Sequence, residues 1–372
     1  MSGPRRSATT ALYVVVPGDL ATRTGGYGYD RRIIAGLRAL GWRVDVVQLA
    51  DGFPFPTAAA RADAERALAA VPDGAMMLVD GLALGVLPDE AARHAARLTI
   101  VALVHHPLAA ETGLDATVAV ALEASERRAL ASARTVVVTS RGTAAALAGY
   151  GVDRNRIAVV EPGTDPAPLA RGSQPPLSNV SQPPASSQQP RHLALLCVAT
   201  LTPRKGHEVL LRALASIADR NWRLTCAGSL DRDAGTTARI RALVRELDLE
   251  DRVSLAGDMD ASQLAIEYDC ADVFVLPTLY EGYGMAVAEA LARGLPVIST
   301  ATGAIAELVG ERAGIVVPPG DVRAFSAALS RVFEDAGLRM QLAAGARAVR
   351  DRLPTWESAA MAIAWALDSS CE

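Results

Sequence analysis

The sequence predicts an α/β protein with two doubly wound parallel sheets, one in each half of the chain. The chain has 372 residues, of which 50% are hydrophobic, and this length suits two cores better than one. Short apolar runs alternate with amphipathic stretches, which is typical of buried parallel strands joined by crossover helices. A segment rich in Pro, Ser and Gln interrupts this alternation near the middle.

This interruption sets the predicted domain boundaries. We expect a Rossmann-like domain over residues 1–168, a flexible linker over 169–191 and a second Rossmann-like domain over 192–354. Residues 355–372 are predicted to form a last helix.

The first half opens with a strand at residues 11–16, a Gly-rich loop at 19–30 and a helix at 29–41. Ligands of doubly wound sheets bind at the carboxyl ends of strands, so the loop around Gly26 is a candidate binding segment. It lacks the G-x-G-x-x-G pattern, and an ordinary strand-to-helix turn remains the alternative. Further strands are predicted at 42–49, 75–82, 99–107, 135–140 and 156–165, and helices at 121–133 and 141–151.

Two histidines end one of these strands. His105 and His106 precede Pro107, at the position where site residues belong in this architecture. Adjacent residues of a strand point to opposite faces, so we do not expect the two rings to share a metal ion. A polar residue that only contacts a helix is the alternative interpretation of His105.

The second half repeats the alternation of strands and helices. Strands are predicted at 193–201, 222–229, 253–259, 272–277 and 297–300, and helices at 238–249, 261–271, 286–292 and 321–335. Of the 37 Lys and Arg residues only Lys205 is Lys, and it follows Arg204 where the first of these strands ends. Its retention suggests a site that requires a compact, flexible ammonium group, with chance survival as the alternative.

Residues 276–300 contain the end of a buried strand, a loop with Gly282 and Gly284, a helix with Gly294 as its expected C-terminal cap, and the next strand. Free N–H groups at the start of this helix favour an anion. Glu281 and Glu289 flank that position with seven residues between them, and a carboxylate can accept two hydrogen bonds from a diol. A nucleotide sugar has this combination of groups. For Glu289, an interaction with the helix dipole alone is the alternative.

The pattern E-G-Y-G-M-x3-E-A-L-A-x-G-x-P-V-I resembles the E-x7-E motif of the family 4 glycosyltransferases, although Tyr283 stands where Phe is usual. T-P-x-K-G-x3-L-L-x-A, around Lys205, resembles the diphosphate-binding segment of the same family. The resemblance spans both halves and is strongest between residues 195 and 321. It implies the GT-B fold, in which two Rossmann-like domains face a central cleft and the C-terminal helix joins the first domain.

The resemblance further implies a retaining transferase. Such an enzyme moves a hexose from a GDP-mannose or UDP-glucose type of donor to a glycan, lipid or small-molecule acceptor. Arg204 and Lys205 would hold the diphosphate and stabilise the leaving group, and Glu289 would bind ribose. Glu281, with the N–H groups of Gly284 and Met285, would hold the sugar hydroxyls.

His105, or His106 in its place, would contact the sugar near its 6-position. The expected catalytic residues are His105, Glu281, Arg204 and Lys205. The expected donor-binding residues are Gly26, Arg204, Lys205, Glu281, Gly282, Tyr283, Gly284, Met285, Ala286 and Glu289. Another GT-B activity, such as a sugar-nucleotide epimerase or a phosphorylase, and a non-catalytic nucleotide-sugar-binding protein remain alternatives.

Composition limits the partners. A formal net charge of −4 argues against a nucleic-acid partner. The four Cys residues form no CxxC pair, so spacing suggests neither a zinc site nor a disulfide framework, and free thiols fit a reducing compartment. Asp258-Met259-Asp260 has the letters of a metal motif but lies in the second domain. We therefore expect metal-independent chemistry without a cofactor.

The expected location is cytoplasmic. The apolar run at 11–16 is too short for a signal peptide, and no apolar run is long enough to span a membrane. Basic residues near the first helix leave open a peripheral contact with the inner face of a membrane, and a solvated basic face is the alternative. These residues are Arg31, Arg32, Arg38 and Arg43.

Overall fold

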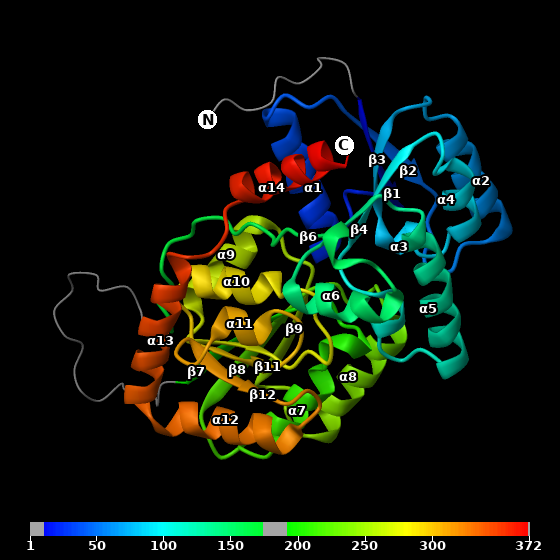
Figure 1. Ribbon diagram of the computed structural model, residues 1–372. Coiled ribbons are helices and arrows are strands. Elements are labelled where there is room, and N and C mark those ends of the chain that lie inside the picture. Colours follow the sequence, from blue (N-terminus) through cyan, green and yellow to red (C-terminus); the bar gives the residue numbers. More distant parts are fainter. Residues whose placement is uncertain (1–10, 174–191, 371–372) are drawn as a thin grey trace. The chain divides into compact units, whose positions relative to one another are not determined.

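A computed structural model describes residues 11–173 and 192–370 of the chain. Two compact units make up the structure: unit 1 is Met1–Gly163 with Pro354–Glu372, and unit 2 is Thr164–Leu353. Each unit contains a six-stranded parallel sheet with helices packed on it (Figure 1). The predicted fold class, two doubly wound α/β domains, is confirmed. Most of the segment predicted as a linker lies outside the described residues.

The sheet of unit 1 has the order β2-β1-β3-β4-β5-β6, and all neighbouring strands are parallel. Its strands are β1 Leu12–Pro17, β2 Val44–Leu49, β3 Met76–Asp80, β4 Thr99–Val104, β5 Thr135–Val138 and β6 Ile157–Val159. The strand order reverses between β1 and β3. Loops that follow these two strands therefore diverge from this point, which is where doubly wound sheets bind ligands.

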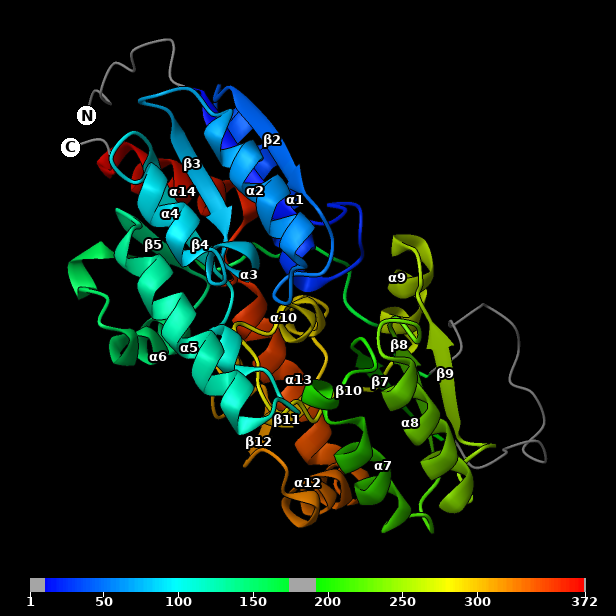
Figure 2. The same cartoon turned by 90° about the vertical axis from the view of Figure 1, so that its right-hand side faces the viewer.

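The helices of unit 1 cover the two faces of this sheet. They are α1 Gly25–Ala39, α2 Ala58–Ala69, α3 Gly81–Leu84, α4 Pro88–His94, α5 Ala116–Ala131, α6 Arg141–Ala146 and α14 Trp356–Ser369. Short 3₁₀ turns lie at Leu108–Ala110, Leu147–Tyr150 and Arg154–Arg156. α1 and α14 lie side by side (Figures 1 and 2). A Cβ atom at Gly36 would come within 2.5 Å of the Ala360 Cβ, so this glycine permits the close packing.

The segment predicted as a Gly-rich loop at residues 19–30 is largely helical. α1 begins at Gly25, because the Thr24 side chain caps the helix by accepting from the Tyr27 N–H at 3.3 Å. The Tyr27 hydroxyl donates to the Pro17 carbonyl at 2.5 Å. Burial of Tyr27 and Tyr29 offsets the low helix propensity of the glycines beside them. Gly26 therefore lies in the first turn of a helix rather than in a loop.

Most predicted strands are shorter in the structure, and two of them show the reason or extent most clearly. The strand expected at 75–82 ends at Asp80, whose carboxylate accepts from the Leu82 N–H at 2.7 Å and starts α3. The strand expected at 156–165 covers only Ile157–Val159. Helices α2 and α4 were not predicted from the sequence, because they have no strong helical periodicity of large apolar residues.

The sheet of unit 2 has the order β12-β11-β10-β7-β8-β9, again entirely parallel. Its strands are β7 Leu193–Val198, β8 Trp222–Ala227, β9 Val253–Gly257, β10 Val273–Leu276, β11 Val297–Thr300 and β12 Gly314–Val317. This is the strand order of classical dinucleotide-binding domains, with the reversal between β7 and β10. All four residues of β10 are at most 1% exposed, which places that strand in the centre of the core.

The helices of unit 2 follow the strands in turn. They are α7 His207–Ala215, α8 Ala234–Glu246, α9 Ala261–Cys270, α10 Met285–Ala292, α11 Ile305–Val309, α12 Val322–Glu334 and α13 Ala336–Arg350. A 3₁₀ turn at Pro203–Lys205 precedes α7, which lies beside α12 (Figures 1 and 2). As predicted, Gly294 ends α10 in the left-handed conformation, with φ +71°. None of the helices in the described part of the chain is both long enough and apolar enough to cross a membrane.

Candidate functional site

In unit 2, the candidate residues lie where the strand order reverses. Arg204 and Lys205 follow β7, and Glu281 follows β10, its neighbour in the sheet. The Lys205 Nζ lies 2.5 Å from Glu281 Oε2, and the Arg204 Nη1 lies 3.8 Å from Glu281 Oε1. The three side chains are only 14–17% exposed. Two segments that are 76 residues apart in sequence thus form one compact cluster of two cations and one carboxylate.

Backbone contacts hold the two segments together. The Arg204 carbonyl accepts from the Leu279 N–H at 2.7 Å and from the Thr278 hydroxyl at 3.1 Å. Arg204 Nη1 also donates to the Tyr280 carbonyl at 2.9 Å. Gly206, at φ +67°, lies so close to Pro277 that a Cβ atom would stand 2.1 Å from the Pro277 carbonyl oxygen. The position of the cations relative to Glu281 is therefore set by the main chain as well as by the ion pairs.

A third segment supports the Glu281 loop from behind. Gly303, at φ +52°, follows β11, and a Cβ atom there would be 1.9 Å from the Glu281 carbonyl oxygen. The Ala304 N–H donates to the Gly282 carbonyl at 3.3 Å. The aromatic ring of Tyr283 is 4% exposed and packs with Ala288 and Ala304. The buried ring of Tyr283 thus anchors the loop, and the loop can offer a ligand its main-chain groups.

Helix α10 presents a second carboxylate. Glu289 accepts a hydrogen bond from the Tyr268 hydroxyl at 3.0 Å, and Tyr268 is fully buried. Burial raises the pKa of Glu289, against the opposing effects of this hydrogen bond and of the Arg293 charge. The carboxylate of Glu289 contacts Tyr268. Gly284 caps α10 at φ +97° without a side chain, which leaves the first N–H groups of the helix, beginning with Met285 and Ala286, without a capping side chain.

In unit 1, His105 follows β4 and lies against α1. Its ring contacts Gly26, where a Cβ atom would stand 3.4 Å from His105 Cδ2, and it meets Tyr29 edge-on at 85°. The Nε2 atom lies 3.3 Å from Asp30 Oδ1. The His105 carbonyl accepts from the hydroxyls of Thr139 at 3.2 Å and Thr143 at 3.4 Å, so backbone and ring are both held.

Two buried carboxylates surround this histidine. Asp30 is 2% exposed and Asp80, at the end of β3, is 5% exposed. Burial and the nearby charge of Asp30 raise the pKa of Asp80 to about 7. Burial alone would lower the pKa of His105, but its contact with Asp30 and the charge of Asp80 outweigh burial and raise it. In His106, the alternative residue for the sugar contact, Nε2 lies 3.7 Å from Glu111 Oε2.

Sequence reasoning missed Asp30, Asp80 and Tyr268. The strand-end rule that selected His105 applies equally to Asp80, which ends the neighbouring strand β3. Asp30 lies within an amphipathic helix, and Tyr268 lies in α9, and neither position carries a sequence signal.

One set of residues in unit 2 could hold a metal ion. Cys197 and Cys226 are register partners on β7 and β8, and His207 Nε2 lies 3.8 Å from Cys197 Sγ. All three are buried, and their ligand atoms lie within 4.8 Å of one another. Thiolates and imidazole are ligands that Zn²⁺ accepts. Residue spacing could not indicate this set because its members come from three elements. Asp260, of the metal-like sequence Asp258-Met259-Asp260, instead caps α9.

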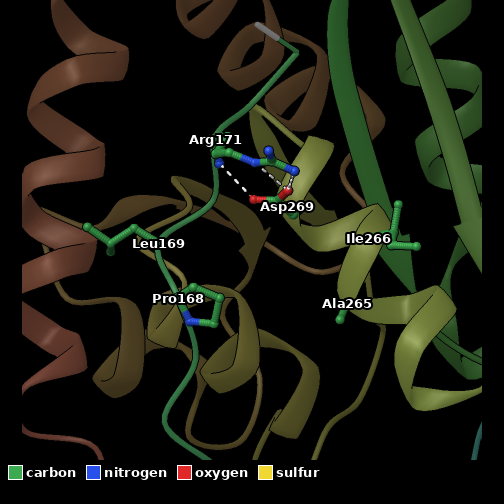
Figure 3. Close-up of a pocket in the computed structure, with 6 residues that line it drawn as sticks. All are labelled: Pro168, Leu169, Arg171, Ala265, Ile266 and Asp269. Carbon is green, nitrogen blue, oxygen red and sulfur yellow. Dashed lines mark hydrogen bonds and ion pairs between the residues drawn. The ribbon is translucent and has the colours of Figure 1, made fainter. Parts of the chain in front are cut away.

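The described part of unit 2 also has two hollows outside this cluster. One, of about 360 Å³, lies between residues 168–171 and α9, where Arg171 pairs with Asp269 (Figure 3). In this view Leu169 and Pro168 lie on the connecting segment, and Ala265 and Ile266 on α9. The other, of about 290 Å³, lies beside Thr202 and Gly206 on the side of α7 and α8. Neither contains Lys205 or Glu281 among its lining residues.

Comparisons with known proteins agree with this geometry. Residues 182–349 match the family described as glycosyl transferases group 1, and residues 83–163 match the glycosyl transferase 4-like domain. A D-inositol 3-phosphate glycosyltransferase of Xylanimonas cellulosilytica is 30% identical over 64% of this chain and 57% of its own length. O-antigen chain mannosyltransferase B of Escherichia coli is 34% identical over 24% of this chain and 23% of its own length. The chain thus spans about half, or less, of the length of these curated relatives.

Solved structures show the same fold. A sucrose-phosphate synthase from Thermosynechococcus elongatus has a TM-score of 0.77 at 23% identity, covering 96% of this chain and 98% of its own. Anabaena Alr3699/HepE, solved in complex with UDP and glucose, has a TM-score of 0.73 at 17% identity, covering 97% and 100%. At these identities the likeness concerns the fold, which is GT-B.

Proposed function

Because this chain belongs to the family 4 glycosyltransferases, we propose that it moves a hexose from a nucleoside-diphosphate sugar to an acceptor with retention of configuration. The observation that carries the proposal is the cluster of Arg204, Lys205 and Glu281 at the strand-order reversal of unit 2. Two partly buried cations beside the start of a helix are suited to a diphosphate, and a carboxylate beside them is suited to sugar hydroxyls.

Each group has a defined role in this proposal. Arg204 and Lys205 bind the diphosphate and stabilise the negative charge that develops on it as the sugar leaves. Glu281 accepts hydrogen bonds from the sugar hydroxyls, together with the N–H groups of Gly284 and Met285, and Glu289 accepts from the ribose diol. His105 keeps the role that the family resemblance implies, a contact near the 6-position of the sugar.

The proposed reaction needs no protein nucleophile and no metal ion. The acceptor hydroxyl attacks the anomeric carbon on the face from which the diphosphate departs, and the departing phosphate takes the proton of that hydroxyl. Lys205 and Arg204 supply the electrostatic stabilisation of the leaving diphosphate that a metal ion would otherwise give. Donors of both types, GDP-mannose and UDP-glucose, fit the carboxylates and cations described. A cytoplasmic location of the enzyme remains our prediction.

Nucleotide binding tests the proposal first. UDP, GDP and ADP would be screened by thermal shift and calorimetry against the unaltered protein and the Lys205→Ala variant. We expect one nucleotide to bind and its affinity to fall at least about tenfold in the variant, because a charge-assisted hydrogen bond is lost. Arg212→Ala is the matched control, since Arg212 pairs with Glu208 on the exposed surface of α7 and should leave affinity unchanged.

The transfer step needs its own measurement. The nucleotide that binds would be supplied as its hexose conjugate, and release of the free nucleoside diphosphate would be followed with sugar, inositol and lipid acceptors. No binding of any of the three nucleotides would refute the proposal. Binding without release, with any acceptor class, would instead favour a non-catalytic nucleotide-sugar-binding protein.

A further inference from the structure

We propose that Asp30 and Asp80 are positioning residues that share a proton and hold His105 as a doubly protonated imidazolium, with Nδ1 aimed at the ligand. This inference rests on the proposed function, because it gives the sugar-contacting His105 a charge. It goes further in assigning the two carboxylates, which neither the sequence patterns nor the family resemblance select. The observations that support it are all within unit 1.

The first observation concerns the hydrogen bonds of Asp30. Neither of its carboxylate oxygens receives a hydrogen bond from a backbone N–H or from a hydroxyl, although both are buried. A buried carboxylate without donors is destabilised because it has lost its hydration without any replacement. The neighbours within reach are His105 Nε2 at 3.3 Å and the Asp80 carboxyl. Asp30 is therefore satisfied only if these neighbours bring protons to it.

The second observation is that both neighbours are able to bring them. Asp80 is 5% exposed, and burial beside a like charge favours its protonated form, which can donate to Asp30. One Asp80 oxygen already accepts from the Leu82 N–H, which leaves the other to carry the proton. His105 can donate through Nε2–H, and the negative charge of Asp30 favours the imidazolium over the neutral tautomer that also carries this proton.

The third observation is that other charged groups around the ring are turned away or paired elsewhere. From α1, Arg31 donates to the carbonyls of Leu20 and Thr22. Arg32 lies over the Trp356 ring of α14, and the Tyr29 hydroxyl donates to the Val160 carbonyl. These donors are therefore directed to other acceptors than the Asp30 carboxylate.

The loop after His105 and the strand beside it add no competing charge. His106 and Glu111 lie near each other, and the groups from β5 and α6 that reach the His105 carbonyl are the neutral hydroxyls of Thr139 and Thr143. Asp30 and Asp80 are thus the ionisable groups that act on the His105 ring.

The consequence for the ligand concerns the second ring nitrogen. With Nε2 facing Asp30 Oδ1 at 3.3 Å, His105 Nδ1 is the remaining donor, and the side chain is 20% exposed. A charged donor makes a stronger hydrogen bond to a hydroxyl oxygen than a neutral imidazole does. We therefore expect the sugar-contacting nitrogen to keep its proton to higher pH than in a free histidine, and the affinity for the donor sugar to depend on Asp30.

The test is a nuclear magnetic resonance titration of the full chain, which has only five His residues. The His105 signal is assigned with His105→Gln, and its titration midpoint is measured without ligand. In Asp30→Asn we expect the midpoint to fall, because burial is then opposed by the charge of Asp80 alone. In Asp80→Asn we expect a smaller fall. Glu111→Gln is the matched control and should move the signal of His106 but not that of His105.

A kinetic readout separates charge from structure. In Asp30→Asn, the basic limb of the pH profile of transfer should move to lower pH, and kcat/KM at neutral pH should fall about tenfold or more. A uniform fall without a change of profile would indicate a structural role and overturn the proposal. So would an unchanged His105 midpoint in Asp30→Asn.

Two further outcomes are distinguishable. If Mg²⁺, Mn²⁺ or Zn²⁺ at micromolar concentration shifts or broadens the His105 signal and Asp30→Asn abolishes the effect, these groups bind a cation and the shared proton is refuted. If the midpoints move as expected but no nucleotide sugar is turned over, the shared proton stands and the proposed transferase function fails.

Discussion

Replacing Glu281 by Gln tests the reasoning about the cation cluster most directly. In the ligand-free protein the Glu281 carboxylate lies 2.5 Å from Lys205 Nζ and 3.8 Å from Arg204 Nη1, with little solvent between them. Glu281→Gln keeps the shape of the side chain but removes its charge. Two adjacent cations are then left without this counter-charge.

The cost to unit 2 can be worked from the burial of the pair. Removing one partner of a fully buried ion pair costs about 3–5 kcal/mol, and an exposed pair contributes under about 1 kcal/mol. At 14–17% exposure we expect about 2 kcal/mol, which lowers the Tm of a unit of this size by about 4–8 °C. The control is Glu208→Gln, which removes the same charge from the exposed Glu208–Arg212 pair and should shift Tm by no more than about 1–2 °C.

The effect on ligand binding has the opposite sign. A bound diphosphate supplies the negative charge that the Glu281→Gln variant lacks. In the variant the diphosphate is also no longer repelled by the Glu281 carboxylate, and this repulsion is about 1 kcal/mol at a partly exposed site. Calorimetry should therefore find the nucleoside diphosphate bound about fivefold more tightly by Glu281→Gln, while sugar transfer falls at least about tenfold. If the variant binds the nucleotide more weakly than the unaltered protein, Arg204 and Lys205 are not the diphosphate site that we infer.

Three further predictions follow from other contacts. Gly303→Ala should weaken nucleotide binding and lower Tm. Gly151→Ala is the control, because Gly151 is left-handed at φ +71° with no atom within 4 Å of an added Cβ, and it should cost only about 1 kcal/mol. Calorimetry and thermal unfolding compare the two variants. Burial raises the pKa of Glu126 to about 8, so between about pH 4.5 and 8 this side chain binds a proton in the folded state but not in the unfolded state. The stability of the fold therefore falls as pH rises through that window. Glu126→Gln should flatten the slope of Tm against pH, and an unchanged slope would contradict this. Tyr268→Phe removes the hydrogen bond to Glu289, and calorimetry should find nucleoside diphosphate binding weakened about tenfold. A change confined to Tm would assign Tyr268 a structural role only.

The part of the site in unit 2 was predictable because its signals are local. The loop with Gly282 and Gly284, the helix that follows and the cap at Gly294 all appear in one continuous stretch, and the structure has them at the predicted places. The pairing of Lys205 with Glu281 was not readable from either segment alone. It follows from the strand order, which places β7 beside β10 across a long separation in sequence.

Unit 1 shows where sequence reasoning failed and why. Glycine letters around Gly26 indicated a loop, but the Thr24 cap and the burial of Tyr29 make the segment helical. Asp30 lies on that helix and Asp80 on a strand, and only the folded chain brings both to His105. Whether a charged residue is buried depends on tertiary packing. The amphipathic pattern of a helix shows only that Asp30 lies on its polar side, and it does not show that the carboxylate is buried.

The division of the chain into units also has a consequence for its biosynthesis. Unit 1 is made of two separated stretches, and its helix α14 is translated only after the whole of unit 2. Ribosomal synthesis proceeds from the N-terminus, so unit 2 is free to complete its own sheet while the α1 surface that receives α14 stays uncovered. During that interval the apolar face around Gly36 is exposed to chaperones and to neighbouring nascent chains. The order of translation, rather than the stability of either finished unit, then sets the period in which this protein is most prone to aggregate.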